Sequence, residues 1–410
     1  MALEAYLSRI SCSHARPLCL VVMPLSGEED DRGQDTGLRP PTAPEECTAE
    51  FLSSILEKEY AIPGLQLDCL SWRDLNVGAL SRVVEINVRY TEVPEQSEMP
   101  QNFIAKFMRP NLPLVHMFEV ESKFYNTLGK DELPFKIPRA IYTSSTLIIM
   151  ERVSACRNFA AIAGCPASLL LQVCTLMARL HSCLWSIDCI GLASPAGIGS
   201  SLDGSSKERI FPKTWQEFLR GLSLAPGLLD RASEICKRLS GTRLCELHDA
   251  IHVTAPRTLI HGDFHVANLL FAEDVWLVDW GSCGEGCPLI DLAFFVIVSV
   301  APDDRCVWEA DMLSAYHSAL GRPELPLPQC RKLYRQCIVN QFVVLVCYDT
   351  MSQQLASMSS FPEELLRHLA EVNLRACHAL VDAFGEDLLP SEKTPGRNED
   401  DLLPLENLVL

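Results

Sequence analysis

The 410-residue sequence has neither a membrane-spanning run nor a basic run. No apolar stretch reaches the 18 or so residues that a spanning helix needs, and the most apolar one, Leu289 to Val300, contains Asp291. The 53 acidic residues outnumber the 35 basic ones, for a net charge of −18. A protein that binds a nucleic-acid duplex needs a basic face to neutralise phosphates. We therefore expect no membrane span and no nucleic-acid partner.

The sequence also lacks a C-x-x-C pair, although it contains 18 cysteines. The cysteines are scattered, and the chain is too long for a small scaffold held together by disulfides. This indicates a reduced intracellular protein with buried thiols. Cys283 and Cys287 lie close together, but no second ligand pair accompanies them, which argues against a metal or redox role.

The two ends of the chain are polar. Arg9 and Arg16 precede the first acidic cluster and weakly resemble a transit peptide, but Glu4 and the apolar run 20–22 argue against one. We expect a cytoplasmic protein. The expected domains are a disordered N-terminal tail (1–46), an N-terminal lobe (47–150), a C-terminal lobe (151–390) and a flexible C-terminal tail (391–410).

Between these ends the hydrophobic pattern changes once. From about 65 to 150 it is typical of strands, with alternation at 84–90 and apolar runs at 103–108 and 147–150, and one helix is expected at about 114–128. From about 160 onward apolar residues recur every three or four positions. Helices are expected near 169–184, 215–239, 288–300, 329–351 and 363–384. The expected fold class is α+β, with a small antiparallel sheet lobe followed by a larger helical lobe, in the two-lobed outline of a kinase-like enzyme.

The most informative motif is His261-Gly262-Asp263, followed by Asn268 and then by Asp279 at the end of a short apolar strand. A hairpin formed by residues 269–271 and 275–278 would bring Asn268 and Asp279 together. Phosphoryl transfer uses such a set: one carboxylate takes the proton of the acceptor hydroxyl, while a second carboxylate and an amide oxygen hold Mg²⁺ against a triphosphate.

This H-G-D-x4-N pattern, with the following Asp and a later D-L-A at 291–293, resembles the aminoglycoside phosphotransferase and choline kinase superfamily. Within it the chain is most similar to the ecdysteroid-kinase-like (CHK kinase-like) branch, through E-x-x-F-Y at 121–125 and a helix end similar to L-H-A-x-x-W at 180–185. The resemblance covers about residues 50 to 385.

The resemblance implies a role for each residue of the motif. Asp263 would be the catalytic base, and Asn268 and Asp279 would bind Mg²⁺. His261 would hold the catalytic loop by hydrogen bonds, and Asp291 would anchor that loop from below. The implied substrates are ATP and a hydroxyl group of a small molecule.

The nucleotide would be bound mainly by the first lobe. Lys106 lies in the middle of an apolar strand, where a lone lysine needs a partner, and Glu121 on the inward face of the next helix supplies one, as in the Lys–Glu pair of kinases. By position alone, the segment containing Glu151 and Val153 is the hinge whose backbone reads adenine. The expected phosphate loop, 75–82, contains a single glycine, so its backbone amides and Ser81 would contact the phosphates less closely than a Gly-rich turn.

Two other classes remain as alternatives: a pseudokinase that binds nucleotide without transfer, and a regulatory interaction protein. The complete set of motif residues argues against both. A protein kinase is disfavoured because no A-P-E follows Asp279 and the spacing to Asp291 leaves no room for a long activation loop. The acceptor would be shaped by the helices of the second lobe and by a loop expected at 193–212, and steroid alcohols, choline-like amines and aminoglycosides are all compatible with the sequence.

Overall fold

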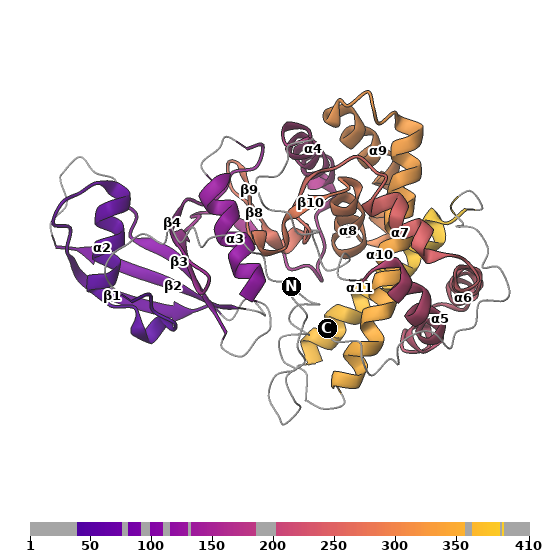
Figure 1. The fold of residues 1–410 in the computed structure, drawn as a ribbon, viewed down its shortest axis with the longest axis horizontal. Coiled ribbons are helices and arrows are strands. Elements are labelled where there is room, and N and C mark those ends of the chain that lie inside the picture. The colour runs from indigo at the N-terminus through magenta and orange to yellow at the C-terminus, as the bar shows by residue number, and fades with distance from the viewer. Residues whose placement is uncertain are drawn as a thin grey trace.

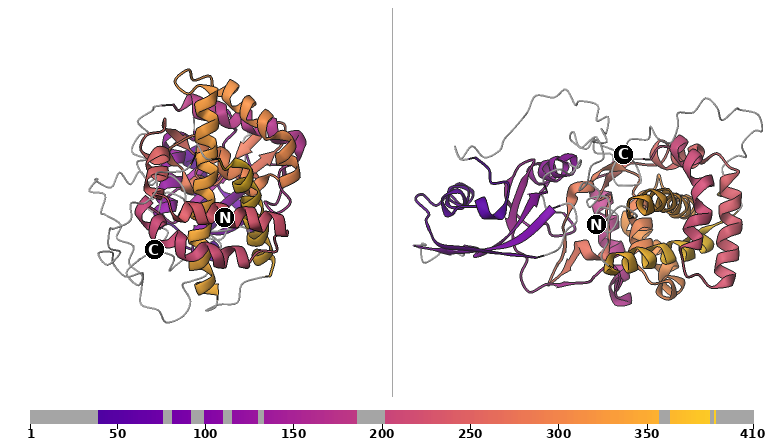
Figure 2. Two further views of the ribbon diagram at one scale, coloured as in Figure 1. Left: turned by 90° about the vertical axis from the view of Figure 1, so that its right-hand side faces the viewer. Right: turned by 90° about the horizontal axis from the view of Figure 1, so that it is seen from below.

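The computed structural model describes residues 39–75, 81–91, 99–109, 115–129, 133–185, 202–356, 363–385 and 388. Two parts lie side by side along the long axis of the molecule, a sheet-containing part and a larger helical part (Figures 1 and 2). The expected fold class, a small antiparallel sheet lobe followed by a larger helical lobe, is confirmed.

The first part is built on a five-stranded antiparallel sheet with the strand order β1-β2-β3-β5-β4. The strands are β1 (Leu67–Asp74), β2 (Ser81–Tyr90), β3 (Asn102–Met108), β4 (Ala140–Thr143) and β5 (Leu147–Glu151). Residues of β3 alternate between the two faces of the sheet. On one face Phe103 and Phe107 pack in a core with α2 (Ala49–Tyr60), whereas the other face carries Lys106 and is covered by α3 (Val115–Thr127).

The second part contains most of the helices. They are α4 (Ala167–Cys183), α5 (Gly204–Arg220), α6 (Pro226–Ser240), α7 (Leu244–His252), α8 (Leu289–Ser299), α9 (Pro302–Leu320), α10 (Leu327–Ala356) and α11 (Glu363–Ala383). All but one of the eleven residues of α8 are buried, and this helix packs against α10 and α11 at the centre of the helical part. A helix that is apolar on all sides is typically buried in such a central position.

Two expectations about the helices are wrong. Residues 215–239 form parts of two helices, because α5 ends at the cap residue Gly221 and Pro226 begins α6. Residues 204–212 were expected to belong to a loop, yet they form the first half of α5. Asp203 caps that helix by accepting a hydrogen bond from the backbone N–H of Ser206 at 2.7 Å.

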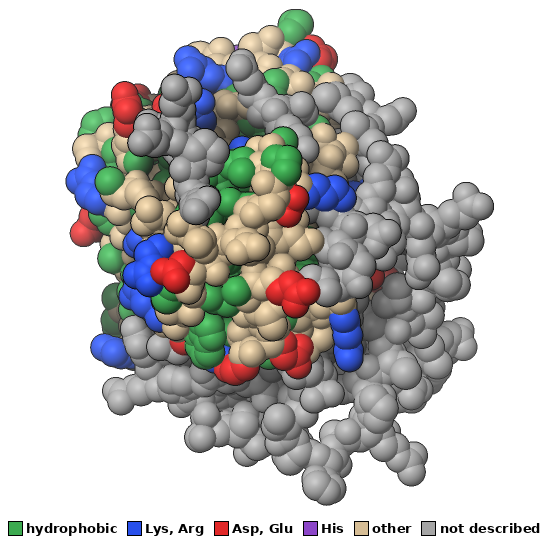
Figure 3. Space-filling view, turned by 90° about the vertical axis from the view of Figure 1, so that its left-hand side faces the viewer, with side chains coloured by type: hydrophobic (Ala, Val, Ile, Leu, Met, Phe, Trp, Pro, Cys, Tyr) green, Lys and Arg blue, Asp and Glu red, His purple; other side chains and the backbone are tan. Residues whose placement is uncertain are grey.

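The surface of the first part mixes charges of both signs. On the face shown in Figure 3, basic and acidic side chains of the described residues are interspersed among hydrophobic ones. Arg82, for example, bonds both Asp74 and Glu45, at 2.8 Å each. Within the described parts of the chain, no helix combines the length and the apolar character required to cross a membrane.

Candidate active site

The catalytic-loop motif folds as one buried unit between β7 (Thr258–Ile260) and β8 (Leu269–Phe271). Asp263 and Asn268 are each 2% exposed, and the Asn268 side-chain amide donates a 2.9 Å hydrogen bond to the backbone oxygen of Asp263. The strand β9 (Val275–Leu277) pairs with β8, and the Val278 N–H donates to the Asn268 carbonyl at 3.1 Å. The predicted hairpin is therefore present, and it brings Asn268 close to the segment that carries Asp279.

A buried carboxylate holds this loop from the helical core. Asp291, in the first turn of α8, accepts hydrogen bonds from the backbone N–H groups of His261 at 2.7 Å and Gly262 at 2.9 Å. His181 of α4 contacts the same carboxylate at 3.1 Å, and its other ring nitrogen contacts the Tyr316 hydroxyl at 2.7 Å. Asp291 thus has the anchoring position expected from the sequence. No sequence motif pointed to Tyr316, which lies on α9.

His261 supports the backbone of the loop. Its Nδ1 accepts a hydrogen bond from the Asp263 N–H at 3.3 Å, so the ring proton lies on Nε2, which donates to the Val278 carbonyl at 3.1 Å. Burial lowers the pKa of His261, which keeps the imidazole in this neutral form. The side chain therefore joins the catalytic loop to the segment leading to Asp279.

Lys106 lies between two carboxylates. Its Nζ is 2.6 Å from Glu121 Oε2 on α3 and 2.8 Å from Asp279 Oδ1. The contact with Glu121 was predicted; the direct contact with Asp279 was not. Burial alone would lower the pKa of Lys106, but the charges of Asp279 and Glu121 raise it overall, so the amine is held as an ammonium.

The two carboxylates respond differently to burial. The Glu121 side chain is 2% exposed, and desolvation raises its pKa to about 7 despite the opposing effect of Lys106. Asp279 is 28% exposed, and there the charge of Lys106 outweighs the effect of burial and lowers the pKa. Asp279 is therefore the carboxylate that remains ionised and partly exposed, as a cation ligand must be.

The donor set at Asn268 and Asp279 fits Mg²⁺. One amide oxygen and one carboxylate are hard oxygen ligands, and Mg²⁺ in phosphate sites typically takes one or two protein ligands and completes its shell with water and phosphate oxygens. The Asn268 amide nitrogen is engaged with Asp263, which turns the amide oxygen away from that residue. In the described parts of the chain, no group of three or more His, Cys, Asp or Glu side chains forms a closed metal cage.

The other residues predicted to bind nucleotide lie along the sheet and the hinge. Ser81 is buried at the start of β2, opposite Met108 of the strand that carries Lys106. Residues 76–80 of the expected phosphate loop lie outside the described residues. Glu151 ends β5, and its carboxylate accepts a hydrogen bond from the Tyr60 hydroxyl.

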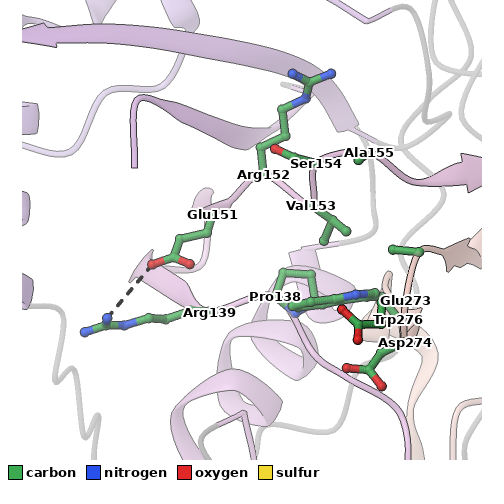
Figure 4. A pocket seen from close by; sticks show the side chains of 11 residues that line it. Pro138, Arg139, Glu151, Arg152, Val153, Ser154, Ala155, Glu273, Asp274 and Trp276 are labelled. Carbon is green, nitrogen blue, oxygen red and sulfur yellow. Dashed lines mark ion pairs between the residues drawn. The ribbon is translucent and has the colours of Figure 1, made fainter. Parts of the chain in front are cut away.

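Glu151 and Val153 also line a cavity of about 420 Å³ (Figure 4). Its walls also include Pro138, Trp276, Arg152 and the β8–β9 turn (272–274). The guanidinium of Arg152 pairs with Glu85 of β2 at 2.8 Å. Neither Lys106 nor the catalytic loop is among the residues that line this cavity.

Comparison with known proteins relates these features to a family. Residues 166–327 match the family described as APH, phosphotransferase enzyme family. The curated protein sequences include no match. A choline kinase structure from Cryptosporidium parvum is 11% identical and aligns over 80% of this chain and 95% of its own, with a TM-score of 0.50.

Two further solved structures are similar at a lower TM-score of 0.44. A macrolide 2′-phosphotransferase from Brachybacterium faecium is 16% identical over 77% of this chain and 98% of its own. An ADP-bound aminoglycoside phosphotransferase is 16% identical over 80% of this chain and 99% of its own. Likeness at such identity concerns the fold, which is kinase-like. The segment that contains the catalytic loop, residues 166–327, thus matches the phosphotransferase enzyme family.

Proposed function

We propose that the protein is an ATP-dependent phosphotransferase that phosphorylates a hydroxyl group of a small molecule. The observation that carries this proposal is the position of Lys106 between Glu121 and Asp279 at 2.6 and 2.8 Å. An ammonium fixed in this way can contact nucleotide phosphates, and Asp279 beside it can hold their Mg²⁺. The family match of residues 166–327 supports the same class of reaction.

In the proposed reaction the acceptor hydroxyl oxygen forms a new bond to the γ-phosphorus, and the bond from that phosphorus to the β–γ bridging oxygen breaks, releasing ADP. The hydroxyl proton passes to the carboxylate of Asp263. Lys106 contacts the phosphates, while Asn268 and Asp279 would hold Mg²⁺, which neutralises phosphate charge when bound. The hinge backbone at Glu151 and Val153 would bind the base, and Ser81 would contact a phosphate.

The finer assignment is to the ecdysteroid-kinase-like branch. It is supported by E-x-x-F-Y in α3, where Glu121 faces Lys106, and by the end of α4, where His181 faces Asp291. The acceptor would then be a small-molecule alcohol received by the helical part of the protein.

Asp263→Asn tests the proposal most directly. The amide keeps the shape of the side chain but cannot take a proton at neutral pH, so we expect phosphoryl transfer to fall by about 100-fold or more, with ATP affinity unchanged. Wild type and variant are assayed with a panel of hydroxyl-bearing metabolites, and nucleotide affinity is measured by calorimetry. Turnover by the variant at the wild-type rate would exclude Asp263 as the base, and absence of transfer by the wild type to every acceptor would favour a nucleotide-binding protein without transfer activity.

A further inference from the structure

The catalytic loop contains a second buried histidine, His265, to which the sequence assigned no role. The residue is 3% exposed, and neither ring nitrogen has a hydrogen-bond partner among the described residues. Leaving a buried polar group unpaired destabilises a folded protein. An unpaired buried polar group in a native structure therefore calls for an explanation. A role in catalysis is one explanation that applies to such groups.

The ring faces the proposed base. Its Nε2 lies 3.5 Å from Asp263 Oδ2, and the Asn268 side-chain amide lies 3.4 Å from the same oxygen. His265 immediately precedes the short helix 266–268, and its own carbonyl accepts a hydrogen bond from the Asn268 N–H at 2.9 Å. The side chain of Phe294, on α8, packs beside the ring with centroids 6.4 Å apart. Two potential N–H donors thus flank one oxygen of Asp263.

His261, the other histidine of the motif, has a different task. Both of its ring nitrogens are engaged with backbone groups, those of Asp263 and Val278. His261 therefore stabilises the backbone conformation of the loop. Of the two histidines, His265 is the one whose ring nitrogen is directed toward the Asp263 carboxylate. Distances slightly beyond hydrogen-bond length are common at catalytic sites without substrate and shorten when the reactive complex forms.

We propose that His265 is a positioning residue for Asp263. This inference rests on the proposed phosphotransferase function. In the reactive state the imidazole donates its Nε2–H to Asp263 Oδ2, which fixes the rotamer of the carboxylate so that Oδ1 receives the proton of the acceptor hydroxyl. His265 does not contact the acceptor in this role; it acts through Asp263, by holding the base within the narrow range of geometry that transfer requires.

Two substitutions separate the hydrogen bond from the volume of the side chain. His265→Gln retains an N–H donor at a similar reach, whereas His265→Phe fills the site without one. We expect the Phe variant to lose about 100-fold in kcat, and the Gln variant to stay within about tenfold of wild type, with KM for ATP and the melting temperature unchanged in both. Equal losses in the two variants, or a loss in KM alone, would overturn the proposal.

A control is available on α7. His252 also has a buried ring nitrogen without a hydrogen-bond partner among the described residues, but its ring stacks on His248 of the same helix, with centroids 4.4 Å apart. We expect His252→Phe to leave kcat unchanged. A loss equal to that of His265→Phe would mean that kcat responds to any buried imidazole, which contradicts a specific role for His265.

A structural readout keeps the test independent of turnover. If the wild type phosphorylates no acceptor, the proposed function fails while the positioning role can still be examined in crystals of wild type and His265→Phe with ADP and Mg²⁺. The proposal expects the Asp263 carboxylate to adopt a second rotamer in the Phe variant. An unchanged Asp263 side chain would overturn it.

Discussion

Trp280 lies flat against Phe124, with ring centroids 3.8 Å apart and planes inclined by 9°. Trp280 follows Asp279 in the sequence, and Phe124 is on α3 one turn after Glu121. The next residue, Gly281, lies so close to α3 that a Cβ there would come within 3.3 Å of the Met117 carbonyl. The Asp279 segment is thus packed directly on the helix that supplies Glu121, and this packing sets the distance between the two carboxylates that Lys106 bridges.

We expect Phe124→Leu to lower the transfer rate as well as stability, because the loss of the stacked ring lets α3 move relative to Asp279. The free energy of unfolding should fall by about 1 to 3 kcal/mol. Phe218→Leu is the matched control: this ring is equally buried, but it packs edge-to-face on Phe342 in the helical core. The test is to measure urea unfolding and the steady-state transfer rate of both variants. A similar fall in transfer rate in both would mean that lost stability alone explains the effect.

Lys106 and Glu121 should behave as one unit. Lys106→Met and Glu121→Gln should each reduce transfer, and the double variant should be little worse than the poorer single variant, because the task proposed for Glu121 is to hold Lys106 on the phosphates. Stranding a buried charge can also destabilise the fold, so a thermal melt accompanies each rate. Losses that multiply in the double variant would contradict the proposed coupling.

Asp279→Asn should weaken binding of ATP in the presence of Mg²⁺ by about tenfold or more and should also reduce the rate, because a metal-bridging carboxylate acts both before and during transfer. Calorimetric titrations with and without Mg²⁺ provide the measurement. The difference between the two titrations should shrink in the variant. A difference as large as in the wild type would remove Asp279 from the metal site.

Lys207, on α5, should make stability depend on alkaline pH. The residue is 1% exposed; its ammonium donates to Asn340 at 2.9 Å and contacts His248 at 3.1 Å, and burial lowers its pKa to about 8. Below pH 8 Lys207 is protonated in both the folded and the unfolded protein. The free energy of unfolding is then lowered by the full cost of burying the charge. Between about pH 8 and 10.4 only the unfolded chain keeps the proton, so the contribution of Lys207 to stability rises with pH.

The measurement is urea unfolding of wild type and Lys207→Met from pH 7 to 10. The variant lacks the buried charge, so its stability advantage should be largest near pH 7 and should shrink by up to about 3 kcal/mol toward pH 10. Asp203 and the thiols of Cys245 and Cys347 also face this site. They are present in both proteins, and comparison at each pH cancels their own titration. A difference that does not change with pH would show that Lys207 does not titrate in this range.

The spacing of the catalytic motif could be interpreted without the fold, because it is local. A loop, a short turn and a two-stranded hairpin follow one another directly, so Asp263, Asn268 and the approach to Asp279 are placed by the nearby backbone. The strands around Lys106 were recognisable for a similar reason, since alternation in β2 and an apolar run in β3 are local patterns typical of buried strands.

Ion pairs between residues far apart in the chain could not be recognised from the sequence. Helix α9 was not expected, since its first turns are rich in charged residues. One of these residues, Arg305, is buried because Glu309 of the same helix and Asp382 of α11 pair with it. The partners of His181 are similarly distant: Asp291 and Tyr316 come from two other helices.

By itself the sequence determined the fold class, the local arrangement of the motif residues and the pairing of Lys106 with Glu121. Only the tertiary structure decided that Lys106 also contacts Asp279, that Asp291 forms a buried network with His181 and Tyr316, and that His265 faces Asp263. Among the described residues, the ring nitrogens of His265 have no hydrogen-bond partner. The physical reason is that hydrophobic periodicity reports which face of an element is buried. The partner of a buried polar group depends on how distant elements pack, and no local pattern encodes that.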